Sequence, residues 1–163
     1  MTRVAFSLSS ASVREAVAQL ERYRDGLPAK LERMLARLSE EGVAAAVAVV
    51  PEDTGELRSS IESRREGPRR YLVVAENGHA AFVEFGTGVV GQGTYPGELP
   101  KGWGYDTRRT PEAHDPADPT LWYYYDRDGD LRCTRGRVAS GYMLAASEEM
   151  RRKVLEIARE VFA

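Results

Sequence analysis

The chain has 163 residues, with 23 Lys and Arg against 25 Asp and Glu and a formal net charge of −2. This length suits a single domain over residues 1–163, and the balanced charge gives no support to a sequence-independent nucleic-acid binder, which needs a strongly basic face. One cysteine, Cys133, excludes an intrachain disulfide and a cysteine-based zinc site, and the longest apolar run, residues 43–50, is far shorter than the roughly twenty residues that span a bilayer.

Two helices are predicted in the first third of the chain. Ser12 and Glu15 form a capping box for a short helix over residues 12–24. Asp25-Gly26 should break that helix, and Pro28 suits the first turn of a second one, roughly 33 Å long, with Gly42 as its weak point. Apolar residues at helical spacing give the second helix one stripe: Leu27, Leu31, Met34, Leu35, Leu38, Ala45, Ala46 and Val49.

The middle of the chain changes to an extended pattern. Residues 61–77 flank Gly67-Pro68 and residues 121–134 flank Asp128-Gly129, so each stretch predicts a β-hairpin. "HAAFVEFGT" is short and helical or irregular, and residues 88–119 form a long loop rich in Gly and Pro. From about Val138, a helical stripe reaches the C-terminus. The expected fold is α+β, with N- and C-terminal helices packed on an antiparallel sheet of about four strands.

The spacing GxGxxG at Gly86, Gly88 and Gly91 raises the question of a dinucleotide site. Such a motif needs a helix to open directly after it, so that helix amides face the pyrophosphate. Here the next dozen residues are dense in Gly and Pro, and no helix is expected to open. We therefore predict no nucleotide and no other cofactor.

Other candidate sites also have simpler explanations. Asp126, Asp128 and Asp130 resemble the start of a calcium loop, but the glycine falls at the wrong place, so a tight turn is predicted and no metal. His79 and His114 lack metal-ligand spacing, and His114 should point at water. Cys133 is expected to be a small packing residue, and the aromatic run 122–125 to pack on a sheet.

Glu84 is an acid between apolar neighbours, Val83 and Phe85. A raised pKa for acid catalysis is one interpretation. The favoured one is a carboxylate that accepts hydrogen bonds from nearby backbone amides or from an arginine such as Arg58.

Three segments together resemble the tail-component family of tailed bacteriophages and prophages: "VPEDTGELRSSI" (50–61), "HAAFVEFGTG" (79–88) and "GRVASGYMLAASEEM" (136–150). They match the patterns D-T-G-x-L-R-x-S, Y-A-x-x-V-E-F-G-T and G-x-x-x-x-x-F-M-x-x-A, with His79 in place of the usual aromatic. The motif residues, all expected to be structural, are Asp53, Thr54, Gly55, Leu57, Arg58, Ser60, Ala80, Val83, Glu84, Phe85, Gly86, Thr87, Gly136, Tyr142, Met143 and Ala146. Asp53 or Thr54 should cap a short turn, and Gly55 should permit a tight bend.

The resemblance implies a structural protein of the virion neck, acting in head–tail joining or tail completion, with no catalytic residues. The expected partners are copies of itself in a ring of six, together with the adjacent head–tail connector and tail-tube proteins. The ring would be assembled in the host cytoplasm, and DNA would pass through it without sequence-specific binding. Loop 88–119 is expected to be a docking arm that orders against a neighbour, with contact residues Gly88, Gly91, Tyr95 and Trp103.

Three alternatives belong to other functional classes. A small enzyme could use Glu84 with His79 and His114. A nucleic-acid-binding module could use the tyrosines and "GPRRY" (67–71). A toxin or immunity-type protein would bind one cognate partner tightly and would not self-assemble.

Overall fold

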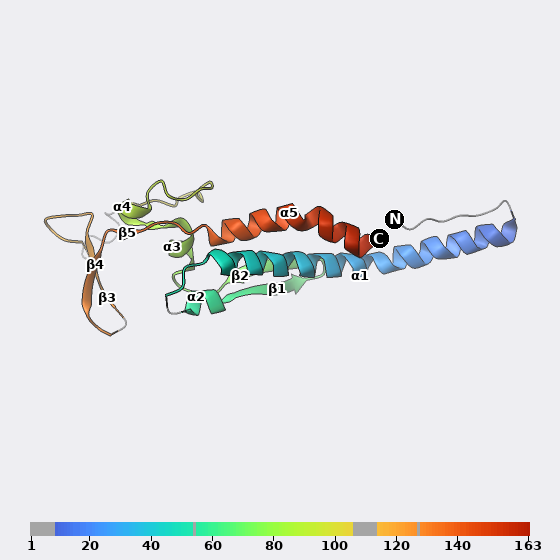
Figure 1. Ribbon diagram of the computed structural model, residues 1–163, viewed down its shortest axis with the longest axis horizontal. Coiled ribbons are helices and arrows are strands. Elements are labelled where there is room, and N and C mark those ends of the chain that lie inside the picture. The colour runs from blue at the N-terminus through green and yellow to red at the C-terminus, as the bar shows by residue number, and fades with distance from the viewer. Residues whose placement is uncertain (1–8, 54, 106–113, 127) are drawn as a thin grey trace. The chain divides into compact units, whose positions relative to one another are not determined.

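The computed structural model describes residues 9–53, 55–105, 114–126 and 128–163 (Figure 1), so the motif residue Thr54 and part of the long loop, 106–113, lie outside it. The chain divides into two compact units. The first comprises Met1–Ala44, Glu62–Val74 and Ala146–Ala163, and the second Ala45–Ile61 and Ala75–Ala145. The elements in chain order are α1 (Ser10–Val49), α2 (Glu56–Ser59), β1 (Ile61–Gly67), β2 (Arg70–Ala75), α3 (Ala80–Phe85), α4 (Gly88–Gly91), β3 (Trp122–Tyr125), β4 (Leu131–Thr134), β5 (Gly136–Arg137) and α5 (Tyr142–Phe162).

Helix α1 is continuous over Ser10–Val49, so the prediction of two helices with a break at Asp25-Gly26 is wrong. Gly26 costs about 1 kcal/mol in a helix, and Pro28 removes one hydrogen bond. Both lie among residues with strong helical propensity. Pro28 is exposed, so water can reach the carbonyl four residues earlier that Pro28 leaves without its helical hydrogen bond. The helix begins earlier than predicted, because the Ser9 hydroxyl caps it by accepting a hydrogen bond from the Ser12 amide at 3.2 Å.

In the first unit, α5 and the β1–β2 hairpin lie along α1 (Figure 1). Ile157 of α5 is fully buried. Gly42 is a point of close packing, and not the expected weak point, because a Cβ there would lie 2.9 Å from both Met150 Sδ on α5 and Val73 Cγ2 on β2. The absence of a side chain at this position lets three elements approach one another.

Glu32 attaches the hairpin to α1. Its carboxylate accepts hydrogen bonds from Arg65 Nε at 3.1 Å, the Arg69 amide at 3.0 Å and the Tyr71 hydroxyl at 3.2 Å. The hydrogen bond from Arg65, followed by that from the Arg69 amide, lowers the pKa of Glu32 from 4.5 to about 2. Further along the helix, the hydroxyls of Ser39 and Ser63 lie 2.6 Å apart.

The two predicted hairpins are both present, but they form separate two-stranded sheets, so the expected sheet of about four strands is wrong. Hairpin pairing is encoded locally by the turn, whereas pairing between hairpins depends on tertiary contacts that sequence periodicity does not report. The Asp128-Gly129 turn is confirmed: Asp126 accepts the amides of Asp128 at 3.0 Å and Asp130 at 2.9 Å, and Gly129 has φ 84°.

Helix α5 starts at Tyr142, later than the predicted start near Val138, because residues 136–137 form β5 and Gly141 takes φ 64°. Within the described residues, neither α5 nor any other helix combines the length and the apolar character that a bilayer-spanning segment requires.

Candidate functional site

The glycines of the GxGxxG spacing bring two backbone segments together. After α3, Gly86 turns the chain with φ 78°, and Thr87 and Gly88 then pair with Arg137 and Gly136 of β5. A Cβ on Gly136 would lie 1.9 Å from the Thr87 carbonyl oxygen, and one on Gly88 would lie 2.3 Å from the Arg135 carbonyl oxygen. The glycines therefore permit direct backbone contact, the same physical need that makes glycine common in phosphate loops.

A four-residue helix, α4, begins at Gly88 and ends at Gly91, the last glycine of the motif, and residues 92–105 after it are turns and irregular structure, so the expectation that no helix opens directly after the motif is confirmed. Its length is a single turn, and Gly88 and Gly91 are buried against the backbone of residues 135–137. The Val90 amide in this turn donates to the Arg135 carbonyl at 3.3 Å. The segment is a packing element in the described structure.

Glu84 is 4% exposed and caps α5 from a distant part of the sequence. Its Oε2 accepts a hydrogen bond from the Met143 amide at 2.8 Å. Its Oε1 accepts hydrogen bonds from the Leu144 amide and from the Tyr95 hydroxyl, both at 3.1 Å. The first amides of a helix lack intrahelical partners and carry the positive end of its dipole, so a carboxylate is a strong cap. The expected bonds to backbone amides are present, whereas Arg58 pairs with Glu52 at 3.0 Å.

Further hydrogen bonds join α3 to the residues that precede α5. Ser140 donates through its amide and its hydroxyl to the Val83 carbonyl, both at 3.0 Å, and the Gly141 amide donates to the Glu84 carbonyl at 3.1 Å. The buried Tyr142 hydroxyl donates to the Ala80 carbonyl at 3.3 Å. Burial, and then the charge of Glu84, raise the pKa of Tyr142 to about 12, so this hydroxyl stays protonated. We call this set of contacts the Glu84 junction.

Part of the long loop folds back over α3. The Phe85 ring packs against Tyr95 with ring centres 5.0 Å apart and against Trp103 at 4.8 Å, and the Tyr105 hydroxyl donates to the Phe85 carbonyl at 2.7 Å. Tyr95 and Trp103 are therefore engaged within the chain. Residues 95 and 103 thus pack on α3 within one copy, and the role of the loop as a docking arm stays a prediction.

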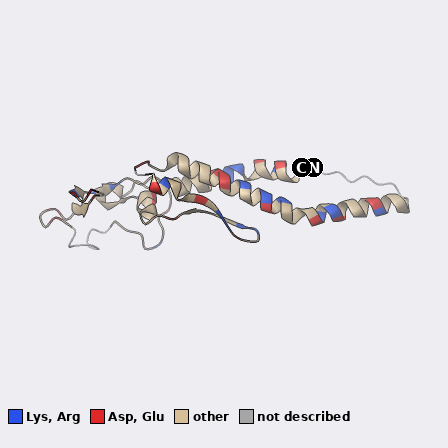
Figure 2. Ribbon diagram, turned by 90° about the horizontal axis from the view of Figure 1, so that it is seen from below, with Lys and Arg blue, Asp and Glu red and all other residues tan. Residues whose placement is uncertain are grey.

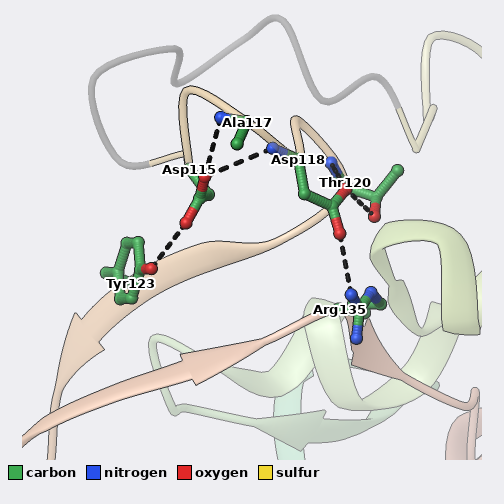
Figure 3. Close-up of polar contacts among 6 residues, drawn as sticks. All are labelled: Asp115, Ala117, Asp118, Thr120, Tyr123 and Arg135. Atoms are coloured by element: carbon green, nitrogen blue, oxygen red, sulfur yellow. Dashed lines mark hydrogen bonds and ion pairs between the residues drawn. The ribbon is translucent and has the colours of Figure 1, made fainter.

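The end of the loop is also held by internal hydrogen bonds (Figure 3). Asp115 accepts the amides of Ala117 and Asp118 and the Tyr123 hydroxyl, the last at 2.6 Å. Asp118 accepts the Thr120 hydroxyl at 2.6 Å and pairs with Arg135 at 2.7 Å; these interactions, in that order, lower its pKa from 3.8 to about 2. This Asx-rich turn connects the loop to β3 and to the residue before β5.

A cleft of about 640 Å³ brings two family motifs together within the second unit. Its lining residues come from the D-T-G-x-L-R segment, the approach to α3, and the β3–β4 hairpin: Pro51, Asp53, Gly55, Glu56, Leu57, Arg58, Asn77, His79, Val83, Tyr124, Tyr125, Asp126, Asp128 and Arg137. Gly55, with φ 78°, occupies the N-cap position of α2 and makes no side-chain cap, so the expected capping role of Asp53 is wrong, and the alternative cap, Thr54, lies outside the described residues. The left-handed bend that Gly55 supplies is what the motif needs here.

The structure separates the residues of the enzyme alternative. Glu84 is used as a helix cap, and His79 lies at the cleft. His114 is buried with its ring 5.5 Å from Trp122, edge to face, so the expectation that it points at water is wrong. Among the residues that the structure describes, no three His, Cys, Asp or Glu side chains gather to form a metal site.

Two further expectations fail because few of the described residues cover the β3–β4 hairpin. Cys133 is exposed and is not a packing residue. Tyr123, Tyr124 and Tyr125 form the predicted strand, yet all three are exposed. Sequence alternation identifies a strand, but it does not show whether another layer covers the strand.

The basic cluster around "GPRRY" is largely neutralised by glutamates. Arg64 pairs with Glu62 at 2.6 Å, Arg65 with Glu32 at 3.1 Å, and Arg70 with Glu66 at 2.7 Å. Figure 2 shows the two signs of charge interspersed along α1 and on the β1–β2 hairpin. Arginines held by carboxylates are less available to phosphates.

Sequence reasoning did not find the partners of Glu84. The amides of Met143 and Leu144 lie 59 and 60 residues further along the chain, and no local spacing connects them to Glu84. One available signal was the absence of a Ser, Thr, Asp or Asn directly before the helix at the Gly141 position, because such a helix needs its cap from elsewhere.

Comparison with known proteins gives one family. Residues 14–86 match the family described as "Bacteriophage HK97-gp10, putative tail-component". No curated protein and no solved structure matches the chain. The matched range contains the D-T-G-x-L-R segment and α3 through Gly86, and it ends before the long loop and α5. A tail component is a structural part of the virion. Over residues 14–86, the chain is therefore similar to the HK97-gp10-like family of putative bacteriophage tail components.

Proposed function

We propose that this protein is a structural protein of the phage neck, which acts in head–tail joining or tail completion by forming a ring of six copies around the DNA channel. The observation that carries the proposal is the family match over residues 14–86. Its partners are its own copies, the head–tail connector proteins on one side and the tail-tube proteins on the other.

The roles of the motif residues support a structural function. Glu84 has three hydrogen-bond donors around its carboxylate, and Gly86, Gly88 and Gly136 permit backbone contacts. A general base needs a lone pair directed at a substrate, whereas this carboxylate is buried against a helix terminus. These roles support a motif that packs segments of the chain together.

Exposed apolar side chains supply surface for docking. Large apolar residues that would be covered in a self-contained protein lie open in both units, including Val13, Val17, Leu20, Phe82, Val89, Val90, Leu99, Tyr125, Leu131 and Val138. Apolar side chains left open on the surface can be covered when a protein docks within an assembly. A closed ring of identical copies needs two unlike surfaces on each copy, and these residues are distributed over several elements.

The charge pattern suits a channel through which DNA must slide. A wall rich in unpaired arginine would hold phosphates and slow ejection, whereas Arg64, Arg65 and Arg70 are paired with glutamates. The net charge of −2 is compatible with passage without sequence-specific binding.

Inactivation of the gene in its phage or prophage tests the proposal. An early stop codon should give DNA-filled heads and separate tails that do not join or that have an incomplete end, as seen by negative-stain microscopy, and expression of the protein in trans should restore joined particles. Reconstruction of the neck should place a ring of this chain between connector and tail tube. Normal yields of infectious particles without the protein would overturn the proposal.

A further inference from the structure

Among the described residues, the N-terminal part of α1 presents an apolar stripe beyond the ends of α5 and the β1–β2 hairpin; Ala16 on this part is buried, and the larger apolar side chains are exposed. The carbonyl of Ala163, at the end of α5, lies 3.5 Å from Lys30 Nζ, and the turn of the β1–β2 hairpin is bonded to Glu32. Residues 10–27, which we call the α1 arm, extend past both points (Figure 1). Val13, Val17 and Leu20 follow i, i+4, i+7 spacing on the arm, and Leu20 is 55% exposed.

This stripe continues one that the chain covers elsewhere. Leu31, Met34 and Leu38 lie on the same face of α1 and are partly buried in the first unit, where the β1–β2 hairpin and α5 lie against the helix. A helix gains most of its stability from packing of an amphipathic face, so the arm needs an equivalent cover. The chain itself shows which kind of cover fits α1: a two-stranded hairpin, bonded through a tyrosine and close to the helix backbone at Gly42.

In the β3–β4 hairpin, by contrast, it is a hairpin face that is exposed. Its register pairs Tyr123 with Cys133 and Tyr125 with Leu131, which puts these four side chains on one face. We call this the open face of the hairpin, because Tyr125 is 75% exposed, Leu131 59%, and the other two are also exposed. A two-stranded hairpin is marginally stable in water unless a helix or further strands pack on it.

Within the described residues, no hairpin of its own unit covers the α1 arm, and no helix of its own unit covers the open face of the β3–β4 hairpin. Arg24 lies in the apolar stripe of the arm, and a covering surface must therefore accept a cation. Tyrosine rings attract a guanidinium, and Asp128 at the hairpin turn offers negative charge beside them, whereas Asp130 already pairs with Arg132 at 3.2 Å and Arg24 with its neighbour Asp25 at 2.9 Å. The α1 arm is a helix and the open face belongs to a hairpin, both surfaces are apolar, and their charges are complementary.

We infer that the open face of the β3–β4 hairpin in one copy packs on the α1 arm of the next copy. The contact is heterologous, because the two surfaces are unlike, so it repeats from copy to copy and can close a ring. The inference rests on the proposed assembly and names the surfaces that build it. Pairing of two arms, by contrast, would bury like surfaces and stop at a dimer.

The single native cysteine makes this contact testable in virions. Val13→Cys, Val17→Cys and Leu20→Cys phages each place a second thiol on the arm stripe, while Cys133 marks the open face. Treatment of intact particles with a short bis-maleimide cross-linker, followed by denaturing electrophoresis, should give a ladder of dimers, trimers and higher species for at least one variant. Adding Cys133→Ala to that variant should abolish the ladder. Arg22→Cys is the matched control, since it lies about 200° around the helix from Leu20, and it should give no ladder.

Each contrary result has a distinct meaning. Dimers that persist after Cys133→Ala would show arm–arm pairing and overturn the inference. A product of monomer mass that has lost both thiols would show that the hairpin meets the arm of its own chain, which also overturns it. Particles that contain the protein but give no cross-link in any arm variant would overturn the inference and leave the proposed function standing. Particles that lack the protein would overturn both.

Discussion

At the level of single residues, Glu84 performs for α5 the task that an N-cap side chain normally performs locally. Local caps use a Ser, Thr, Asp or Asn adjacent to the helix, and their hydrogen bond fixes only the helix end. A cap from α3 also fixes the position of α3 relative to the first turn of α5, through the amides of Met143 and Leu144. This explains why a carboxylate, with two acceptor oxygens, occupies the motif position.

Glu84→Gln tests this role. The glutamine amide keeps one acceptor oxygen but directs an NH₂ group at donors, so at least one buried donor loses its partner. We expect a loss of about 1–3 kcal/mol in the free energy of unfolding, measured by urea denaturation. Glu52→Gln removes a carboxylate from an exposed pair with Arg58 and should change stability by less than about 1 kcal/mol. Equal stability of Glu84→Gln and the wild type would refute the capping role.

Gly136 and Gly129 both have positive φ, at 106° and 84°, but differ in their surroundings. A Cβ on Gly129 would meet nothing within 4 Å, whereas one on Gly136 would lie 1.9 Å from the Thr87 carbonyl oxygen. Gly129→Ala should therefore cost only backbone strain, about 1–2 kcal/mol. Gly136→Ala should in addition open the bridge between β5 and Thr87, and we expect at least twice the loss of Gly129→Ala in the same denaturation assay. Similar losses of stability in the two variants would mean that the bridge between β5 and Thr87 contributes nothing to the free energy of unfolding.

Glu32 gives the first unit a stability that depends on pH. Its pKa is lowered from 4.5 to about 2 in the folded protein, so the stabilisation is fully present above pH 4.5 and is lost as the pH falls towards 2. Glu32→Gln should lower the melting temperature at neutral pH and make it less sensitive to pH within this window. Glu40→Gln, an exposed change on the same helix, serves as the charge control. An unaltered pH profile in Glu32→Gln would exclude this linkage.

At the level of elements, the two glycines inside α1 have opposite expected effects when replaced by alanine. A Cβ on Gly26 would meet nothing within 4 Å, so Gly26→Ala should raise the free energy of unfolding by about 0.5–1 kcal/mol through helix propensity alone. At Gly42, the same change meets Val73, whose branched side chain has little freedom to move, and Met150. We expect Gly42→Ala to lose about 1–2 kcal/mol.

Thermal unfolding, monitored by circular dichroism at the helix band, measures the stability of both variants of α1. A gain for Gly42→Ala would mean that α5 and β2 do not approach α1 this closely. A loss for Gly26→Ala would mean that α1 is bent at this point, as its Asp-Gly dipeptide suggests from sequence alone. Gly26→Ala therefore tests the continuity of the helix, and Gly42→Ala tests its packing.

The elements themselves were predictable where their signals are local. The stripe from Leu27 to Leu38, the Asp128-Gly129 turn and the C-terminal stripe each identify the correct element, because periodicity and turn chemistry operate within a few residues. Continuity of α1 was not predictable from Gly26 and Pro28, since long stretches with high propensity on both sides outweigh two unfavourable residues. The prediction that the two hairpins join into one sheet was wrong, because no local pattern encodes the pairing of one hairpin with another.

At the level of the whole molecule, the family motifs predicted the function class better than they predicted the geometry. The tail-component resemblance is confirmed over residues 14–86, although the positions that a motif brings together depend on partners such as Ser140 that lie outside this range. The motif residues meet in two places, the Glu84 junction and the cleft beside Gly55, and both depend on long-range contacts. Sequence spacing alone could therefore identify the residues as structural but could not show what they hold together.

The charge distribution of the whole chain predicts weak interaction with DNA. Net charge is −2, and Arg64 and Arg70, on the most basic hairpin, pair with Glu62 and Glu66. In fluorescence anisotropy with duplex DNA near physiological salt, we expect binding weaker than the roughly 10⁻⁴ to 10⁻⁶ M of non-specific DNA-binding proteins. The double variant Glu62→Gln/Glu66→Gln releases both arginines and should bind more tightly, with a steeper salt dependence. Tight, strongly salt-dependent binding by the wild type would instead favour the nucleic-acid-binding alternative, since it requires phosphate contacts that a sliding channel must avoid.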